Sequence, residues 1–235
     1  MYYVAANFGR RSTSGGNEGG TGGSSGGSNG GTTVIPDTQT PLDPGITIAD
    51  QDVPLAGAVG LNDADHFAYV IGYEEDGTVR PLNNISRAEV ATIFFRLMTE
   101  EFRQSNWSTV NSFIDVEEGD WYNNAVSTCA KAGILTGYED GSFKPNASIT
   151  RAEFAAVAAR FLDDSYVDDG KGDFSDTADH WAASYIRLAA KAGWINGSGN
   201  RFDPEEYITR AQVMTIVNRM LDRTPDKDHM LPSMK

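Results

Sequence analysis

Cysteine, histidine and positive charge are all scarce in this 235-residue sequence. A single cysteine, Cys129, excludes an internal disulfide framework and a cysteine-based zinc site. The three histidines lack the spacing of metal ligands or of a catalytic triad. With 19 Lys and Arg against 33 Asp and Glu, the formal net charge is −14, so the protein as a whole would repel nucleic acid and anionic membrane surfaces. We therefore expect no nucleic-acid partner, no metal and no cofactor.

Long apolar runs are also missing. No stretch approaches the roughly 18 consecutive apolar residues of a transmembrane helix, so we expect no membrane insertion. Met1–Arg11 lacks the charged start and the apolar run of a secretory signal, which leaves either a protein that stays inside the cell or a piece of a longer chain. Hydrophobic residues still make up 40% of the sequence, enough for a core, and the composition disfavours most enzymes.

The first quarter of the chain differs from the rest. Residues 12–33 are rich in Gly and Ser, and residues 34–60 contain several Pro and Asp, so we interpret 12–60 as a flexible linker. Residues 1–11 form a short tail, which is either an unstructured end or a strand that docks on something. The folded domain is then expected over residues 61–235.

A six-residue pattern recurs three times in this domain, as Ile85–Val90, Ile149–Phe154 and Ile208–Val213. Each copy contains Ser or Thr, then Arg-Ala, then Glu or Gln. From each arginine, apolar residues follow at +3, +6, +7, +10 and +11, the spacing of a helix with one buried stripe. Because no single copy could bury its stripe alone, we expect the three helices to pack together.

In copies two and three, the recurring pattern is preceded by a second motif, in which Phe-x-Asp is followed a few residues later by a tryptophan, Trp121 or Trp181. Residues at +4, +5 and +8 from each tryptophan predict a further helix, closed by Ala-Lys-Ala-Gly. Cys129 falls on the inner face of one such helix and is expected in the core. We expect both tryptophans to pack over the helix ends, with stacking on a sugar ring as the alternative. The acids of the Phe-x-Asp units, Asp115 and Asp176, are expected to cap turns.

A turn that begins at Gly72, Gly137 or Gly197 separates the paired helices, and Asp-Gly and Pro mark it as tight. A calcium-binding loop is the functional alternative. It is disfavoured, because the alternating Asp or Asn ligands and the closing Glu of an EF-hand are absent.

The recurring arginines, Arg87, Arg151 and Arg210, need a separate explanation. The Ser or Thr before each and the Glu or Gln after it predict a capping box that starts the helix. The arginine itself would sit at the positive end of the helix dipole, which costs about 0.3–1 kcal/mol. Two readings follow: an anion site made with free helix N–H groups, or a salt bridge to an acid of the neighbouring copy. A second set at +9, namely Arg96, Arg160 and Arg219, is expected to be solvated or salt-bridged at the surface.

These motifs, in the order in which they follow one another along the chain, resemble the S-layer homology domain family. The resemblance implies a mainly α fold of three helix-loop-helix repeats (about 61–103, 113–163 and 174–222) in a pseudo-threefold arrangement around a central helix bundle. It also implies non-covalent anchoring of a surface protein to the bacterial cell wall, outside the cell, by binding secondary cell wall polysaccharide, often with a pyruvylated sugar. The implied ligand-binding residues are Arg87, Arg151, Arg210, Trp121, Trp181, Gly72, Gly137 and Gly197.

The sequence departs from the family pattern in two copies. Copy one has no preceding tryptophan, and copy three has Gln212 for Glu and Ser198 for the turn Tyr. We therefore expect the best groove around Arg151. The predicted function is wall attachment without catalysis, because caps and turns account for the acids that a glycan-cleaving enzyme would need. The alternative is self-association into a layer or filament, with residues 1–11 contacting a neighbouring subunit.

Overall fold

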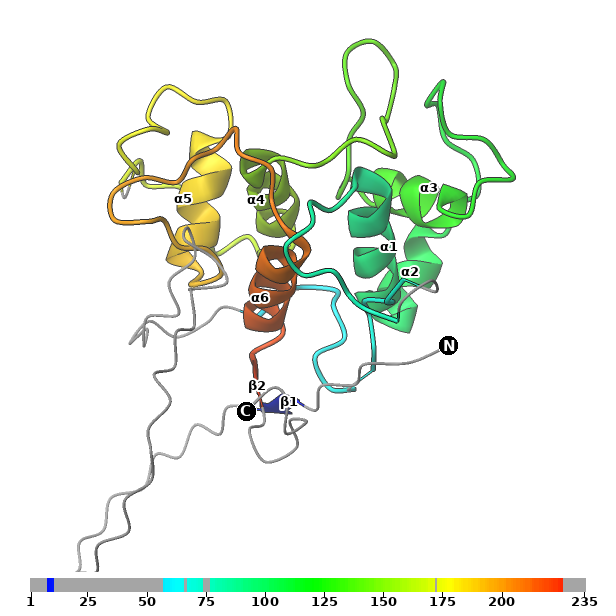
Figure 1. Cartoon of the computed structure of the whole chain (residues 1–235), viewed down its shortest axis with the longest axis horizontal. Coiled ribbons are helices and arrows are strands. Elements are labelled where there is room, and N and C mark those ends of the chain that lie inside the picture. The colour runs from blue at the N-terminus through cyan, green and yellow to red at the C-terminus, as the bar shows by residue number, and fades with distance from the viewer. Residues whose placement is uncertain (1–7, 11–56, 66, 74–76, 172, 226–235) are drawn as a thin grey trace, which may run out of the picture.

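The computed structural model describes residues 8–10, 57–65, 67–73, 77–171 and 173–225. Within these ranges the chain is mainly helical, as predicted, and forms six helices and two short strands (Figure 1). The helices are α1 (Arg87–Leu97), α2 (Glu100–Asn106), α3 (Asn123–Lys131), α4 (Arg151–Ala159), α5 (Ala183–Lys191) and α6 (Arg210–Met220). The disorder expected of the Gly/Ser-rich linker falls on residues outside the described ranges. Among the described helices, none combines the length and the apolar character that crossing a membrane requires.

The three helices that follow the recurring motif begin as the sequence predicts. In α1, Ser86 Oγ accepts from Glu89 N at 3.3 Å, and the Glu89 carboxylate accepts from Ser86 N at 2.8 Å. The same reciprocal pair starts α4 at Thr150 and α6 at Thr209. Each box satisfies two backbone donors at a helix end, worth about 1 kcal/mol per cap.

A ring of backbone hydrogen bonds joins the starts of these helices. Ile149 N donates to Ile85 O at 3.1 Å, Ile208 N to Ile149 O at 3.1 Å, and Ile85 N to Ile208 O at 3.3 Å. The three isoleucines are at most 1% exposed. Because each repeat donates to one neighbour and accepts from the other, the ring closes with pseudo-threefold symmetry. Helices α1, α4 and α6 follow the ring and lie at the centre of the domain, between α5 and α3 (Figure 1).

The apolar stripes of α1, α4 and α6 fill the space between them. The ring of Phe94 stacks on Phe161 with centroids 4.8 Å apart and on Phe154 with centroids 5.9 Å apart. Helix α3 packs on α1, and α5 packs on α4, so the second helix type lies outside the bundle. Cys129 is fully buried and lies in the core, as predicted.

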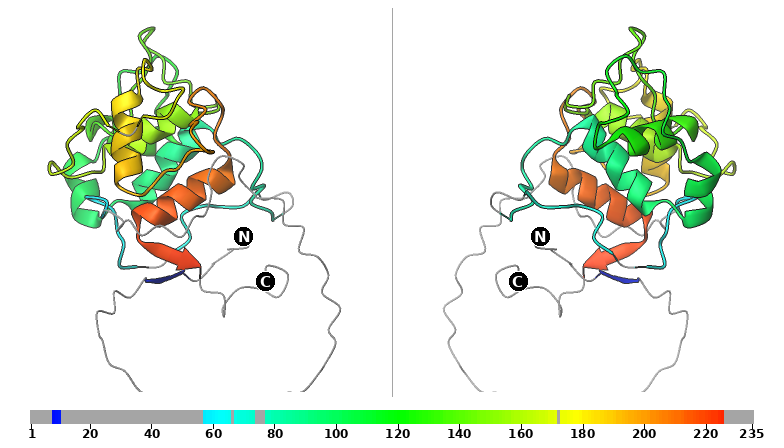
Figure 2. Two further views of the ribbon diagram at one scale, coloured as in Figure 1. Left: turned by 90° about the vertical axis from the view of Figure 1, so that its left-hand side faces the viewer. Right: turned by 90° about the vertical axis from the view of Figure 1, so that its right-hand side faces the viewer.

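Three features go beyond the expected pattern. Helix α2 follows α1 directly, with Thr99 as its N-cap, and contacts α3. Repeat one, in its described residues before α1, has no counterpart of α3 or α5. Strand β1 (Phe8–Arg10) pairs antiparallel with β2 (Arg223–Pro225) at the end of the domain beyond α6 (Figure 2). For these three residues of the tail, the docked strand is the reading that the structure supports.

Candidate binding grooves between the repeats

The three recurring arginines connect the repeats in a ring, and we call them the inter-repeat arginines. Nε of each donates to a carbonyl in the turn of the next repeat: Arg87 to Phe143 O at 2.8 Å, Arg151 to Phe202 O at 2.7 Å, and Arg210 to Val79 O at 2.7 Å. All three are buried, with 3–5% of their surface exposed. Repeat one therefore reaches into repeat two, two into three, and three back into one.

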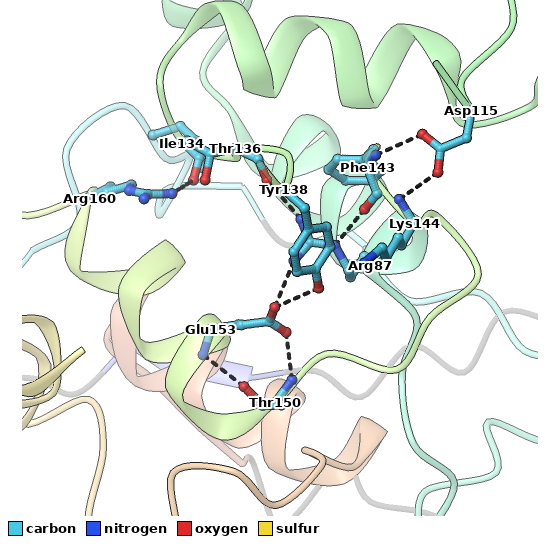
Figure 3. Close-up of polar contacts among 10 residues, drawn as sticks. All are labelled: Arg87, Asp115, Ile134, Thr136, Tyr138, Phe143, Lys144, Thr150, Glu153 and Arg160. Carbon is cyan, nitrogen blue, oxygen red and sulfur yellow. Dashed lines mark hydrogen bonds and ion pairs between the residues drawn. The ribbon is translucent and has the colours of Figure 1, made fainter. Parts of the chain in front are cut away.

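The rest of the Arg87 guanidinium is also engaged (Figure 3). Nη2 donates to Thr136 O at 2.8 Å, and Nη1 lies 3.4 Å from Glu153 Oε1. Arg210 repeats this arrangement: Nη2 donates to Ile71 O at 3.1 Å, and Nη1 pairs with Glu89. The salt bridge to a neighbouring copy, one of the two readings left open by the sequence, is thus present for Arg87 and Arg210. It offsets the cost of a cation at a helix N-terminus.

The other reading relied on free helix N–H groups, and in this respect it was wrong. The first two amides of α1 donate to the turn of repeat two, Arg87 N to Ala147 O at 3.0 Å and Ala88 N to Pro145 O at 2.9 Å. The corresponding amides of α4 and α6 donate to repeats three and one at 2.8–2.9 Å. Since the capping box takes the third amide, carbonyls and hydroxyls of the protein already occupy these donors.

A groove lies beside the turn of repeat one, and we call it groove A. It has a volume of about 660 Å³. All three repeats contribute to its lining, which includes Tyr69–Tyr73, Glu89 and Arg96 of repeat one, Trp121 of repeat two and Arg210 of repeat three.

The corresponding groove of repeat two, groove B, has a volume of about 440 Å³. Its lining follows the same plan, with Leu135–Glu139, Glu153 and Arg160 of repeat two, Trp181 and Glu205 of repeat three and Arg87 of repeat one. Each groove therefore combines a turn Tyr, a capping-box Glu, an inter-repeat Arg, an Arg nine positions after the motif arginine, and a Trp from the following repeat.

The tryptophans are exposed, which contradicts the prediction that they pack over the helix ends. Trp121 is 67% exposed and Trp181 is 61% exposed, although the indole ring of Trp181 lies near Tyr185 and His180. The helices they precede begin without them, because small residues such as Ala125 and Ala182 supply the buried contacts. A large aromatic face at the edge of a polar groove is suited to stacking on a sugar ring.

Tyr138 and Glu153 hold one wall of groove B together (Figure 3). Tyr138 Oη donates to Glu153 Oε1 at 2.7 Å, and the Arg87 Cζ lies 4.7 Å from the centre of the Tyr138 ring. Burial, followed by the hydrogen bond to the Glu153 carboxylate, raises the pKa of Tyr138 to about 12. The phenol is therefore neutral at physiological pH and donates a hydrogen bond.

The expectation that the best groove surrounds Arg151 stays a prediction. The structure places Arg151 in the turn of repeat three, where it lies over Phe202, with 4.6 Å between Cζ and the ring centre. That turn has Ser198 in place of Tyr, and α6 has Gln212 in place of Glu. Repeat one offers no tryptophan to cover this position, so grooves A and B are the ones with the complete set.

Two residues at the grooves were not expected there, namely Arg96 and Arg160. Both were predicted as ordinary surface residues, yet both are half-buried and line the grooves. Arg160 Nη1 donates to Ile134 O at 2.7 Å, and Arg96 Nη1 to Tyr69 O at 3.4 Å. The available signal was their recurrence at +9, outside the apolar stripe.

The turn glycines permit close packing at the back of each turn. A Cβ atom on Gly137 would lie 2.5 Å from the Phe113 ring, and one on Gly197 would lie 2.3 Å from Arg201 O. At Gly72 the nearest atom, Thr78 O, would be 3.1 Å away.

The prediction that Asp115 and Asp176 cap turns is confirmed. Asp115 accepts from Phe143 N and Lys144 N at 2.7 and 2.8 Å, and Asp176 accepts from the two corresponding amides of repeat three.

Comparisons with known proteins agree with this architecture. The family described as "S-layer homology domain" matches residues 112–155 and 173–214, in repeats two and three. "Cell surface glycoprotein 1" of Acetivibrio thermocellus is 35% identical over 185 residues, which cover 74% of this chain and 8% of that protein. "Cellulosome-anchoring protein" of the same organism is 34% identical over 180 residues, which cover 74% of this chain and 39% of that protein.

A third relative, "Surface-layer 125 kDa protein" of Lysinibacillus sphaericus, is 34% identical over 206 residues, which cover 77% of this chain and 17% of that protein. The chain thus spans less than half the length of each of these relatives. Because the family's matches fall on repeats two and three, and the structure gives repeat one the same capped helix and the same ring contacts, the chain belongs to the S-layer homology domain family.

Proposed function

We propose that this chain attaches a surface protein to the bacterial cell wall by binding secondary cell wall polysaccharide, an acidic glycan, in grooves A and B. The relatives named for the cell surface, for anchoring and for the surface layer support this proposal. Attachment needs no catalytic step. It places the domain outside the cell, on the wall.

The observation that carries the proposal is the pair of exposed tryptophans, Trp121 and Trp181, at equivalent positions of two grooves. A buried aromatic side chain removes roughly 150–250 Å² of surface from water. These two indoles are more than half exposed, so the folded chain gains little of that stabilisation from them. Their placement beside Tyr, Glu and Arg suits a ligand that has both an apolar face and hydroxyl groups, as a pyranose ring does. Two such grooves would let a repeating glycan bind twice, which raises avidity without new contacts.

The remaining predicted site residues take supporting roles in this proposal. Arg87 and Arg210 form the walls by holding Glu153 and Glu89, and Gly72 and Gly137 let the turns approach closely. Arg151 and Gly197 play the same part at the third position between repeats. The net charge of −14 opposes an acidic glycan at long range, but the Debye length of about 8 Å at 0.15 M salt confines this repulsion.

Co-sedimentation of the full chain with purified Gram-positive-type walls tests the proposal. We expect binding to intact walls, loss of binding to walls stripped of secondary polysaccharide, and loss of most binding in a Trp121→Ala, Trp181→Ala double variant. Trp107→Ala is the matched control, because Trp107 is also about half exposed, at 48%, but does not line either groove. Equal binding to stripped walls, or an unaffected double variant, would contradict the proposal.

A second candidate function, self-assembly, is favoured by one observation. Strand β1 pairs with β2 of its own chain although residues 11–56 separate it from the domain. A tether of this composition would also let β1 reach β2 of another copy. If so, the particle size in sedimentation velocity rises with protein concentration and this rise disappears when residues 1–11 are deleted; a size independent of concentration would dismiss this candidate.

A further inference from the structure

The chain enters the domain through residues 57–65, which we call the strap. In Figure 1 the strap is the cyan segment that passes α6 on its way to α1 and α2. The sequence predicts a linker directly before it. An attachment domain is pulled through the chain that joins it to the rest of a protein, so the contacts of the strap decide how the domain meets that tension.

Repeat one holds the strap on both sides of Leu61. Asn62 N donates to Leu97 O at 2.7 Å, and Thr99 N donates to Gly60 O at 2.8 Å. Between these two bonds, the Leu61 side chain is 5% exposed and belongs to the core. The strap thus satisfies the last carbonyl of α1, which has no acceptor role within the helix itself.

Repeat two and helix α2 hold the strap from other sides. Val59 N donates to Phe161 O, just beyond the end of α4, at 2.7 Å. Gly60 has a φ of +79°, and a Cβ atom there would lie 2.8 Å from the Phe102 ring of α2. Only glycine meets both conditions without strain. Helix α2, which the recurring motif does not explain, supplies the surface against which the strap turns.

Repeat three reaches the strap through Arg223, in the strand that follows α6. The residue is 5% exposed, and its Nη2 donates to Asn62 O at 3.2 Å and to Asp65 O at 2.6 Å. Its Nε is buried and has no hydrogen-bond partner among the described residues. Burying a guanidinium with an unsatisfied donor costs free energy, and the two bonds to the strap offset part of that cost.

We propose that the strap is a mechanical clasp, which passes tension from the preceding chain to all three repeats at once. This inference rests on the proposed function, because attachment is what puts the chain under tension. A segment fastened to one repeat would peel that repeat away from the others. A segment fastened to the ends of α1 and α4 and to the residue after α6 loads the whole bundle together, so strap and bundle should give way in one event.

Force spectroscopy on the full chain, held by its two termini, tests the clasp. After the short β1–β2 pair opens, we expect the wild type to release residues 57–225 in a single step of roughly 560–610 Å, at about 3.3–3.6 Å per residue. In Arg223→Gln and in Gly60→Ala, an additional step should precede it at lower force. That step should release at most about 100 Å, since about 30 residues lie between the start of the strap and α1.

Two matched controls separate the clasp from general stability. Arg187→Gln removes an arginine that pairs with Asp168 and Asp173 away from the strap, and Gly170→Ala changes a glycine at a φ of +69° with no atom within 4 Å of the new Cβ. Both should keep the single step, even where urea unfolding shows lower stability, because forced unfolding reports the unfolding rate. Arg223→Lys, which keeps the charge and fewer donors, serves if Arg223→Gln does not fold.

The outcomes distinguish the clasp from the proposed function. Without applied force, Arg223→Gln should bind walls as the wild type does. A wild type that releases the strap in a separate early step would overturn the inference and leave wall attachment standing, and so would folded strap variants that unfold in a single step. A wild type that binds no walls would overturn the proposed function, whatever the number of steps under force.

Discussion

Arg210 in the last helix, α6, forms an ion pair with Glu89 in the first helix, α1, 121 residues earlier in the chain. This contact, with Arg210 Nε on Val79 O, joins the third repeat to the first and closes the ring that Arg87 and Arg151 begin. Repeats one and three also meet through Tyr69, whose Oη donates to Asn218 Oδ1 of α6 at 2.8 Å. The inter-repeat arginines are therefore structural in the first place, whatever else the grooves do.

Arg210→Ala is expected to lower the free energy of unfolding by about 3 kcal/mol, because it removes the cation beside Glu89 and the donors to Val79 O and Ile71 O. Urea denaturation followed by circular dichroism measures this loss. Arg201→Ala is the control, since Arg201 is 64% exposed and pairs with Asp203 at the surface. We expect its effect to stay below about 1 kcal/mol. Equal effects of the two variants would show that the ring closure contributes nothing special.

The turn glycines give a second test of close packing. Gly197→Ala would place a Cβ 2.3 Å from Arg201 O and 2.4 Å from the Phe174 ring, so the turn must shift. Overpacking of this kind costs typically about 1–3 kcal/mol. Gly119→Ala has no heavy atom within 4 Å of the new Cβ and should change the thermal midpoint little. If the Gly197→Ala protein were as stable as the Gly119→Ala protein, the turn would have space for a Cβ atom, contrary to these distances.

Much of this fold follows from local chemistry in the sequence. The capping boxes at Ser86, Thr150 and Thr209 fix the first residue of three helices, and the apolar spacing after each arginine identifies their buried faces. Those signals act within one helix, over a few residues, so a single sequence reveals them. Helix α2 was not predicted, because none of its seven residues is buried and its sequence therefore has no apolar stripe.

The grooves could not be derived in the same way. Which turn receives Arg151 depends on the order of the repeats around the ring, and the motif reads the same whether each arginine enters its own turn or the next one. The exposure of Trp121 and Trp181 is likewise a tertiary result: an aromatic residue before a helix usually signals packing, and only the assembled repeats show that small residues already fill that space.

Cys129 supplies a probe of the core that is independent of the grooves. The thiol is fully buried, its Sγ lies 3.6 Å from Ala91 O, and burial raises its pKa to about 12. The thiolate is the reactive form, so a disulfide reagent at pH 8 should not modify the native protein on a timescale of minutes. The same reagent should titrate one thiol per chain in urea. Fast reaction without denaturant would mean that α3 separates readily from α1.

Because of Tyr138, the free energy of unfolding of the domain should depend on pH in the alkaline range. Its pKa is about 12 in the folded protein and about 10 in an unfolded chain, so the unfolded state loses the phenol proton first. The stabilisation from this group is therefore complete below pH 10 and decreases as the pH rises toward 12. Tyr138→Phe removes the titrating group and the bond to Glu153, so urea midpoints should fall less between pH 9 and pH 11 in the variant than in the wild type. Because burial also raises the pKa of Tyr69, the variant should keep part of the slope. Equal slopes would show that Tyr138 is not held in its buried, hydrogen-bonded position in solution.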